Sequence, residues 1–228
     1  IITVMPKTTI YSTIAFACLL FCGNNEIFSQ GRYAVGTTFS EMPDPTKDIR
    51  SDWSNVKPGL HASFVTIDKR FPKSLNPNIA IQPNMAVDAW KGERVSAQIL
   101  LWTNAAAENV VVSTEELKST AGETIPADVI QARFVRYVMA DEFAGACGYR
   151  KPEDFKAALS PDMLDDLKSY NLESKTVRPV WITVKVPEGA AAGHYKTTIA
   201  VKQNGQVHQR LALTLNVLDH VSPPPSQW

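Results

Sequence analysis

Cysteine and histidine are scarce in this chain, which limits the ways in which its fold can be held together. Only 3 of the 228 residues are cysteines and only 4 are histidines. Two of the cysteines, Cys18 and Cys22, lie in an N-terminal apolar run, so Cys147 would remain alone if that run were removed. A single cysteine forms no internal disulfide. The isolated histidines lack the spacing of a zinc site, and no phosphate-binding glycine loop is present. We therefore expect no cofactor and no metal.

An excess of charge of either sign is also missing. The chain has 23 basic and 23 acidic residues, and 44% of its residues are hydrophobic. Proteins that bind nucleic acid normally carry a clustered basic excess. The balance therefore argues against nucleic acid as a partner and against a polybasic membrane anchor.

No apolar run is long enough to span a membrane. The longest extends from about Ile10 to Cys22, whereas a membrane helix needs roughly 20 apolar residues. Lys7 precedes this run and a polar segment follows it, as in a secretory signal peptide. We expect residues 1–29 to be removed after Ser29 and the protein to be exported to the periplasm, the exterior or the cell surface. A lipoprotein signal, with Cys18 as the modified residue, remains the alternative.

The remaining chain divides by composition into three parts. Residues 30–83 contain scattered prolines and weak periodicity, which predicts an irregular N-terminal wrap with one or two short strands. Residues 84–219 contain the strand candidates and form the predicted sandwich domain. Residues 220–228, HVSPPPSQW, predict a stiff linker because consecutive prolines favour an extended conformation. We expect this linker to lead to a further C-terminal domain.

The strand candidates alternate between apolar and polar residues. Val180, Ile182 and Val184 share one face of a predicted strand, and Leu211, Leu213, Leu215 and Val217 share a face of another. The dipeptide Asn204–Gly205 between two alternating runs predicts a tight hairpin, since both residues tolerate a positive φ. Further strands are predicted at 95–102, at 108–117 and at 129–138.

Residues 141–176 interrupt this pattern. Pro152–Leu159 and Pro161–Tyr170 predict two short helices, the second because Met163, Leu164 and Leu167 have helical spacing after a proline. The fold class predicted for the whole is all-β, an antiparallel immunoglobulin-like β-sandwich with a short helical insertion.

No complete catalytic site can be identified in the sequence. Asp141 and Glu142 are adjacent acids, but neighbouring residues of a strand point to opposite faces. Asp162, Asp165 and Asp166 lack the alternating ligands and glycine of a calcium loop. We therefore assign no catalytic, cofactor-binding or metal-binding residue.

The tryptophans are the residues best suited to contact a sugar, because an exposed indole face packs against the C–H groups of a pyranose ring. Trp102 and Trp181 fall within alternating strands and are expected in the core. Trp53 lies in a polar segment, SDWSN, and is our candidate for sugar stacking.

Three segments carry a family resemblance. RPVWITVKVPEGAAAGHYKTTIAV at 178–201, WKGERVSAQILLWTN at 90–104 and PDMLD at 161–165 together resemble the N-terminal sandwich domain of glycoside hydrolase family 123 proteins. That resemblance implies a following barrel that hydrolyses N-acetylgalactosaminides. In such enzymes the acetamido group of the substrate attacks, and an adjacent Asp–Glu pair in the barrel assists it.

The resemblance therefore implies a non-catalytic accessory domain of a secreted glycoside hydrolase, with the catalytic barrel of the same parent chain as its partner. The alternative is an independent carbohydrate-binding or immunoglobulin-like surface module that binds glycans by itself.

Overall fold

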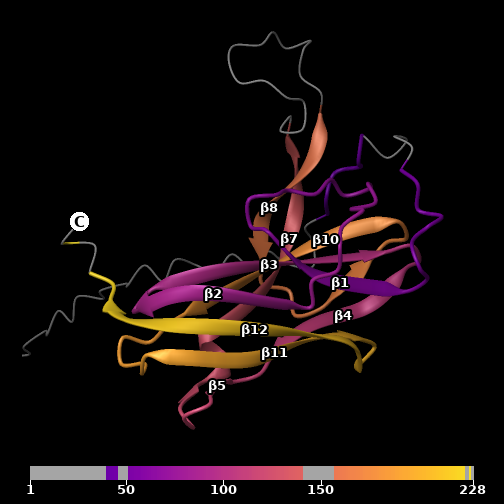
Figure 1. Ribbon diagram of the computed structural model, residues 1–228. Coiled ribbons are helices and arrows are strands. Elements are labelled where there is room, and N and C mark those ends of the chain that lie inside the picture. Colours follow the sequence, from indigo (N-terminus) through magenta and orange to yellow (C-terminus); the bar gives the residue numbers. More distant parts are fainter. Residues whose placement is uncertain (1–39, 46–50, 141–156, 224–225, 227–228) are drawn as a thin grey trace, which may run out of the picture. The chain divides into compact units, whose positions relative to one another are not determined.

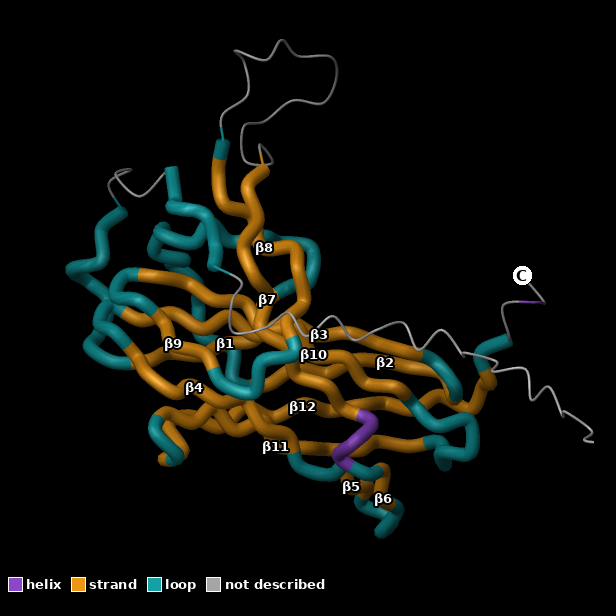
Figure 2. The backbone as a smooth tube through the Cα atoms, turned by 180° about the vertical axis from the view of Figure 1, so that it is seen from behind, coloured by secondary structure: helices purple, strands orange, loops and turns teal. Residues whose placement is uncertain are grey.

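The computed structural model describes residues 40–45, 51–140, 157–223 and 226, and within these ranges the chain is built from strands. Figures 1 and 2 show two sheets packed face to face. The five-stranded sheet has the order β1 (Leu60–Val65), β3 (Arg94–Thr103), β10 (Thr176–Lys185), β7 (Ile130–Ala140) and β8 (Ala158–Asp165). The seven-stranded sheet runs β2 (Asn84–Lys91), β12 (Gln206–Val221), β11 (Gly193–Gln203), β4 (Ala107–Thr114) and β9 (Tyr170–Leu172), with β5 (Leu117–Ser119) and β6 (Thr124–Ile125) at one side.

The predicted all-β sandwich is confirmed. Its pairings are antiparallel except that β2 runs parallel to β12. The 3-10 turn η1 (Ala127–Val129) leads into β7. Among the described residues, no helix has the length and apolarity needed to cross a bilayer.

The main core lies between the sheets and follows the alternation of the sequence. Val180, Ile182 and Val184 of β10 are buried there, as are Leu211, Leu213, Leu215 and Val217 of β12. Alternate residues of a strand point to one face, so each apolar set faces the opposite sheet.

The hairpin at Asn204–Gly205 is also confirmed. Gln203 pairs with Gln206, and the two turn residues have φ values of 49° and 78°. Two consecutive positive φ values define the tight turn whose twist matches that of the flanking strands.

A second apolar cluster covers the outer face of the five-stranded sheet. Ile99 and Leu101 of β3 point into the main core, whereas Leu100 and Trp102 point outward. The outward pair packs with Val65 of β1 and Val177 of β10, and with Trp53 and Phe71 from the segments before and after β1. This explains why β3 is apolar on both faces.

The helix predicted at Pro161–Tyr170 is wrong. Residues 158–165 form β8, which pairs antiparallel with β7. Pro161 is compatible with this strand because β8 lies at the edge of its sheet. The spacing of Met163 and Leu164 is helical only over a few residues, and the long partner strand overrides it.

The first predicted helix, Pro152–Leu159, lies mostly outside the described residues, and its last two residues begin β8. Asp141, Glu142 and Cys147 also lie outside them.

Candidate functional site

The most unusual polar site in the described chain lies where β10 and β7 separate. Their registered pairing ends at Val180 and Phe134. Pro179, the next residue toward the start of β10, has no N–H to continue a ladder. Beyond this point Arg178 donates from Nη1 to the carbonyl of Val135 at 2.8 Å. The N–H of Val177 donates to the carbonyl of Lys73 at 2.8 Å. The loop around Lys73 and a side chain of β10 thus replace the missing strand pairing.

The carboxylate of Glu41 occupies this opening. It forms a bidentate ion pair with Arg178, in which Nη2 lies 3.0 Å from Oε2 and Nη1 bonds to Oε1. Lys73 Nζ lies 3.0 Å from Oε2, and the backbone N–H of Tyr137 donates to Oε1 at 3.0 Å. Charge-assisted and bidentate bonds of this kind are the strongest hydrogen bonds in proteins.

Two tyrosine rings hold the Arg178 guanidinium in place independently of Glu41. Its central carbon lies 4.3 Å from the ring centroid of Tyr170 and 4.8 Å from that of Tyr137. The Tyr137 hydroxyl donates to the carbonyl of Phe71 at 2.9 Å. Cations over aromatic faces gain most when they are desolvated, as this one is.

A second ion pair adjoins the first. Arg136 pairs with Asp165, and both side chains are almost fully buried. Arg136 Nη1 also donates to the hydroxyl of Tyr170 at 3.3 Å, which links the two pairs through that ring. Both buried acids, Glu41 and Asp165, are therefore bound to arginines.

The environment of Glu41 controls its protonation. Burial alone would raise its pKa, but the hydrogen bond and charge of Arg178 oppose this, aided by the N–H of Tyr137 and the charge of Lys73. The net effect lowers the pKa from its ordinary 4.5 to about 2. Burial raises the pKa of the neighbouring Tyr137 hydroxyl. At neutral pH the site therefore holds an ionised glutamate and a neutral tyrosine.

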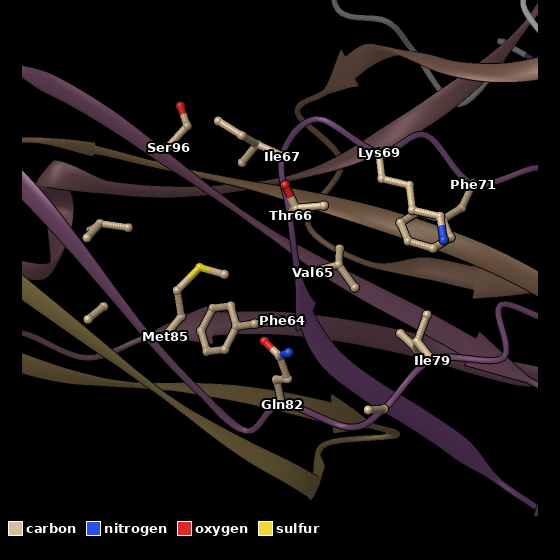
Figure 3. A pocket seen from close by; sticks show the side chains of 13 residues that line it. Phe64, Val65, Thr66, Ile67, Lys69, Phe71, Ile79, Gln82, Met85 and Ser96 are labelled. Atoms are coloured by element: carbon tan, nitrogen blue, oxygen red, sulfur yellow. The ribbon is translucent and has the colours of Figure 1, made fainter.

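A pocket of about 600 Å³ opens between the end of β1 and the start of β2. Figure 3 shows Phe64, Ile67, Ile79 and Met85 around it, with Lys69 beside the ring of Phe71. The Lys69 ammonium lies 4.9 Å from that ring centroid. Phe64 and Phe71 are buried, so the open part of the lining consists of aliphatic side chains and of the polar residues Thr66, Lys69 and Gln82.

Trp53, our candidate for sugar stacking, is buried. Its side chain is 6% exposed and belongs to the outer apolar cluster, and its Nε1 donates to the carbonyl of Ser74 at 3.2 Å. The expectation that it is exposed is wrong because the polar residues around it form a surface turn while the indole points inward. Asp52 stabilises this turn by accepting the N–H of Ser54 at 2.8 Å.

The exposed tryptophan in the described chain is Trp90, which the sequence reasoning missed. It is 42% exposed at the end of β2, and its ring centroid lies 5.9 Å from that of His220 in β12. Residues 84–91 alternate in burial, and Trp90 shares the exposed face of β2 with Asn84 and Asp88, but no strand is predicted there from the sequence.

The three acids of the PDMLDD segment are not brought together as a metal site. Asp165 pairs with Arg136 and Asp166 with Arg133, while Asp162 lies 3.9 Å from Arg70. Within the described ranges, no group of three or more His, Cys, Asp or Glu residues is placed to hold a metal ion.

The model of the glycoside hydrolase 123 N-terminal domain matches residues 64–203, more than half of the chain. The chain belongs to the glycoside hydrolase 123 N-terminal domain family. The match spans β2 to β11, and it includes Arg178 and Tyr137 but neither Glu41 nor Trp53. No curated protein matches the chain in sequence.

A solved structure supports the fold of this family 123 N-terminal domain. A family 123 glycoside hydrolase from Clostridium perfringens, described for glycolipid glycan hydrolysis, superposes with a TM-score of 0.64 at 22% identity. The alignment covers 74% of this chain and 29% of that enzyme. A PapD-like domain of human CEP192 matches at 14% identity over 64% of this chain and 94% of its own, with a TM-score of 0.33.

Proposed function

We propose that this domain is the non-catalytic N-terminal part of an exported glycoside hydrolase, and that it packs against a catalytic barrel in the same parent chain. The family match over residues 64–203 carries this proposal. The chain spans 29% of the family 123 enzyme from Clostridium perfringens, which leaves ample length for a catalytic domain in a parent of similar size. The substrate class that we propose for the parent is N-acetylgalactosaminides.

The chemistry of the described residues favours a non-catalytic accessory role. Glycosidases use carboxyl groups that reach the sugar, one as an acid and one as a base or nucleophile. Here Glu41 and Asp165 are enclosed and bound to arginines, so neither reaches a substrate. The two aromatic rings of the pocket lining, Phe64 and Phe71, are buried and offer no exposed face for stacking on a sugar ring.

The test compares two proteins on chromogenic N-acetylgalactosaminides. Residues 30–228 alone should release no chromophore, whereas the parent, expressed from the longer coding sequence, should hydrolyse the substrate. The sequence beyond Trp228 should encode a barrel with an adjacent Asp–Glu pair. Turnover by residues 30–228, or a parent without a barrel, would contradict the proposal.

Export is tested separately by mass spectrometry of the protein secreted from a native-like host. The mature chain should begin at Gln30, or at a lipidated Cys18 if the lipoprotein alternative holds. A mature species that retains Lys7 would contradict export through this segment.

One observation favours the second candidate function, an independent carbohydrate-binding module. Trp90 offers an exposed indole, and the nearby Lys91–Asp219 pair, at 2.6 Å, adds polar groups for sugar hydroxyls. Isothermal titration of residues 30–228 with N-acetylgalactosamine oligosaccharides would detect such binding. Binding that Trp90→Ala abolishes would support this second function. If the titration releases no heat of binding, the accessory role remains as the proposed function.

A further inference from the structure

We propose that the opening between β10 and β7 is a binding site for an acidic peptide, and that residues 40–45 are its ligand within the chain. The proposal concerns a separable recognition site, so it does not depend on the function of the parent enzyme. It rests on three observations: how this segment is held, how the site is built without it, and what the site would lack if the segment left.

The segment Ser40–Pro45 is held by its acidic side chains. Glu41 is enclosed by Arg178, Lys73 and the N–H of Tyr137, as described above. Three residues later, Asp44 accepts a hydrogen bond from the hydroxyl of Ser74 at 2.5 Å. Between them, Met42 is 59% exposed and Pro43 is exposed. A segment held through two acidic side chains, with exposed residues between them, binds as a peptide ligand does rather than packing as a core strand.

The receiving side is built from elements that Glu41 does not position. Arg178 is fixed by the carbonyl of Val135 and by the rings of Tyr137 and Tyr170. These residues belong to β10, β7 and β9, which are paired within the two sheets. A cation fixed in this way is preorganised for a carboxylate, so little ordering is needed when one binds.

Departure of Glu41 would leave this site with an excess of positive charge. Arg178 and Lys73 are both mostly enclosed, with side-chain exposures of 3% and 12%. Within the described residues, Arg178 Nε already has no hydrogen-bond partner. Lys73 would keep the exposed Glu173 carboxylate 3.9 Å away, but the enclosed Arg178 would lose the carboxylate that pairs with it. A buried cation without its partner is strongly unfavourable, so the empty site would take up another carboxylate. The ligand class is a peptide that carries a glutamate followed, three residues later, by an aspartate.

The experiment converts the internal ligand into a free one. A site for a specific protease is placed between Pro45 and Ser51 in the full chain, and the folded protein is cut there. The N-terminal fragment should remain bound on size-exclusion chromatography. A fluorescent peptide of residues 38–47 should then replace it in a saturable manner that anisotropy can follow.

The decisive comparison is made in the peptide, so that the receiving protein is identical in every arm. Peptide Glu41→Gln should bind at least ten-fold more weakly than the unchanged peptide. Peptide Met42→Ala should bind like the unchanged peptide, because Met42 is exposed. The proposal is overturned if the Glu41→Gln peptide binds as tightly, if no peptide exchanges with the bound fragment, or if cutting alone abolishes cooperative unfolding. The last two outcomes would make the segment an integral part of the fold.

Discussion

Glu41 and Arg178 are separated by 137 residues in sequence, yet they form a bidentate ion pair whose side chains are 5% and 3% exposed. The pair closes the end of the sandwich where the β10–β7 ladder stops. Removing two charges from water is costly, and only good geometry with further hydrogen bonds compensates for it. The N–H of Tyr137, the carbonyl of Val135 and the ammonium of Lys73 supply those further interactions.

Breaking this pair from one side should be strongly destabilising. Glu41→Gln keeps the shape of the side chain but removes the carboxylate that pairs with the enclosed Arg178, while Lys73 keeps only the exposed Glu173, 3.9 Å away. We expect the free energy of unfolding to fall by about 3–5 kcal/mol, the usual cost of an uncompensated buried charge. Urea denaturation followed by tryptophan fluorescence measures this change. Glu108→Gln, at an exposed position of β4, is the control and should change stability by less than about 0.5 kcal/mol. Equal effects of the two substitutions would show that the pair contributes nothing net.

The same carboxyl should make stability depend on pH in the acid range. Its pKa is about 2 in the folded protein, below its ordinary 4.5. The unfolded chain therefore binds the proton first as the pH falls, so the contribution of Glu41 is complete above about pH 5 and is lost toward pH 2. We expect the denaturation midpoint of the unaltered protein to decline over this range. The midpoint of Glu41→Gln should decline less, because glutamine does not titrate. Parallel curves would place the acid sensitivity in other carboxyl groups.

The register of β12 can be tested by two neighbouring substitutions. Leu213 is fully buried between the sheets, whereas Thr214 points to the other face and is half-buried. Leu213→Ala should cost about 2–5 kcal/mol, since it removes buried surface and leaves a cavity. Thr214→Ala should cost much less. Thermal unfolding by circular dichroism distinguishes them, and a larger loss for Thr214→Ala would mean that the inward and outward sets are exchanged.

Trp53 offers a direct test of the corrected assignment. Because its indole packs in the outer apolar cluster, Trp53→Ala should lower the free energy of unfolding by about 3–5 kcal/mol. A sugar-stacking tryptophan would instead be replaceable without loss of stability. Chemical denaturation measures the change in stability. If the variant were as stable as the unaltered protein, Trp53 would have to be an exposed surface residue.

Local pattern accounts for the parts of the fold that could be predicted. Val180, Ile182 and Val184 alternate because β10 has the opposite sheet on one side, and Asn204–Gly205 is a turn for reasons contained in those two residues. Pro161 misled the prediction because its effect depends on whether its strand lies at the edge of a sheet. The position of a strand within its sheet is a property of the tertiary structure, and the local sequence does not reveal it.

The charged site around Glu41 could not be predicted from local sequence patterns. Glu41 lies in an irregular segment, and its partners Lys73, Tyr137 and Arg178 come from three separate parts of the chain. Arg178 occupies a strand next to Pro179, where an arginine would ordinarily be assigned to a solvated face. Alternation places Arg178 on the inward face with Val180 and Ile182, but neither the separation of β10 from β7 nor the carboxylate in that opening has a local signal. The family resemblance also gave no help, since Glu41 precedes the matched residues.

The β11–β12 turn allows the backbone requirement for glycine to be measured without any change in packing. Gly205 has a φ of 78°, and a methyl group added there would meet no atom within 4 Å. Any cost of Gly205→Ala therefore comes from forcing an L-residue into the left-handed region, which costs roughly 1–2 kcal/mol. Gly189 is the matched control, since it is equally open but does not have a positive φ of this kind. Gly189→Ala should be neutral or should stabilise the protein by up to about 1 kcal/mol, because alanine restricts the unfolded chain. The difference between the two denaturation free energies isolates the strain of the turn. If both variants were equally stable, the Asn204–Gly205 hairpin would have to use a turn without positive φ at its second residue, and the pairing of Gln203 with Gln206 would need revision.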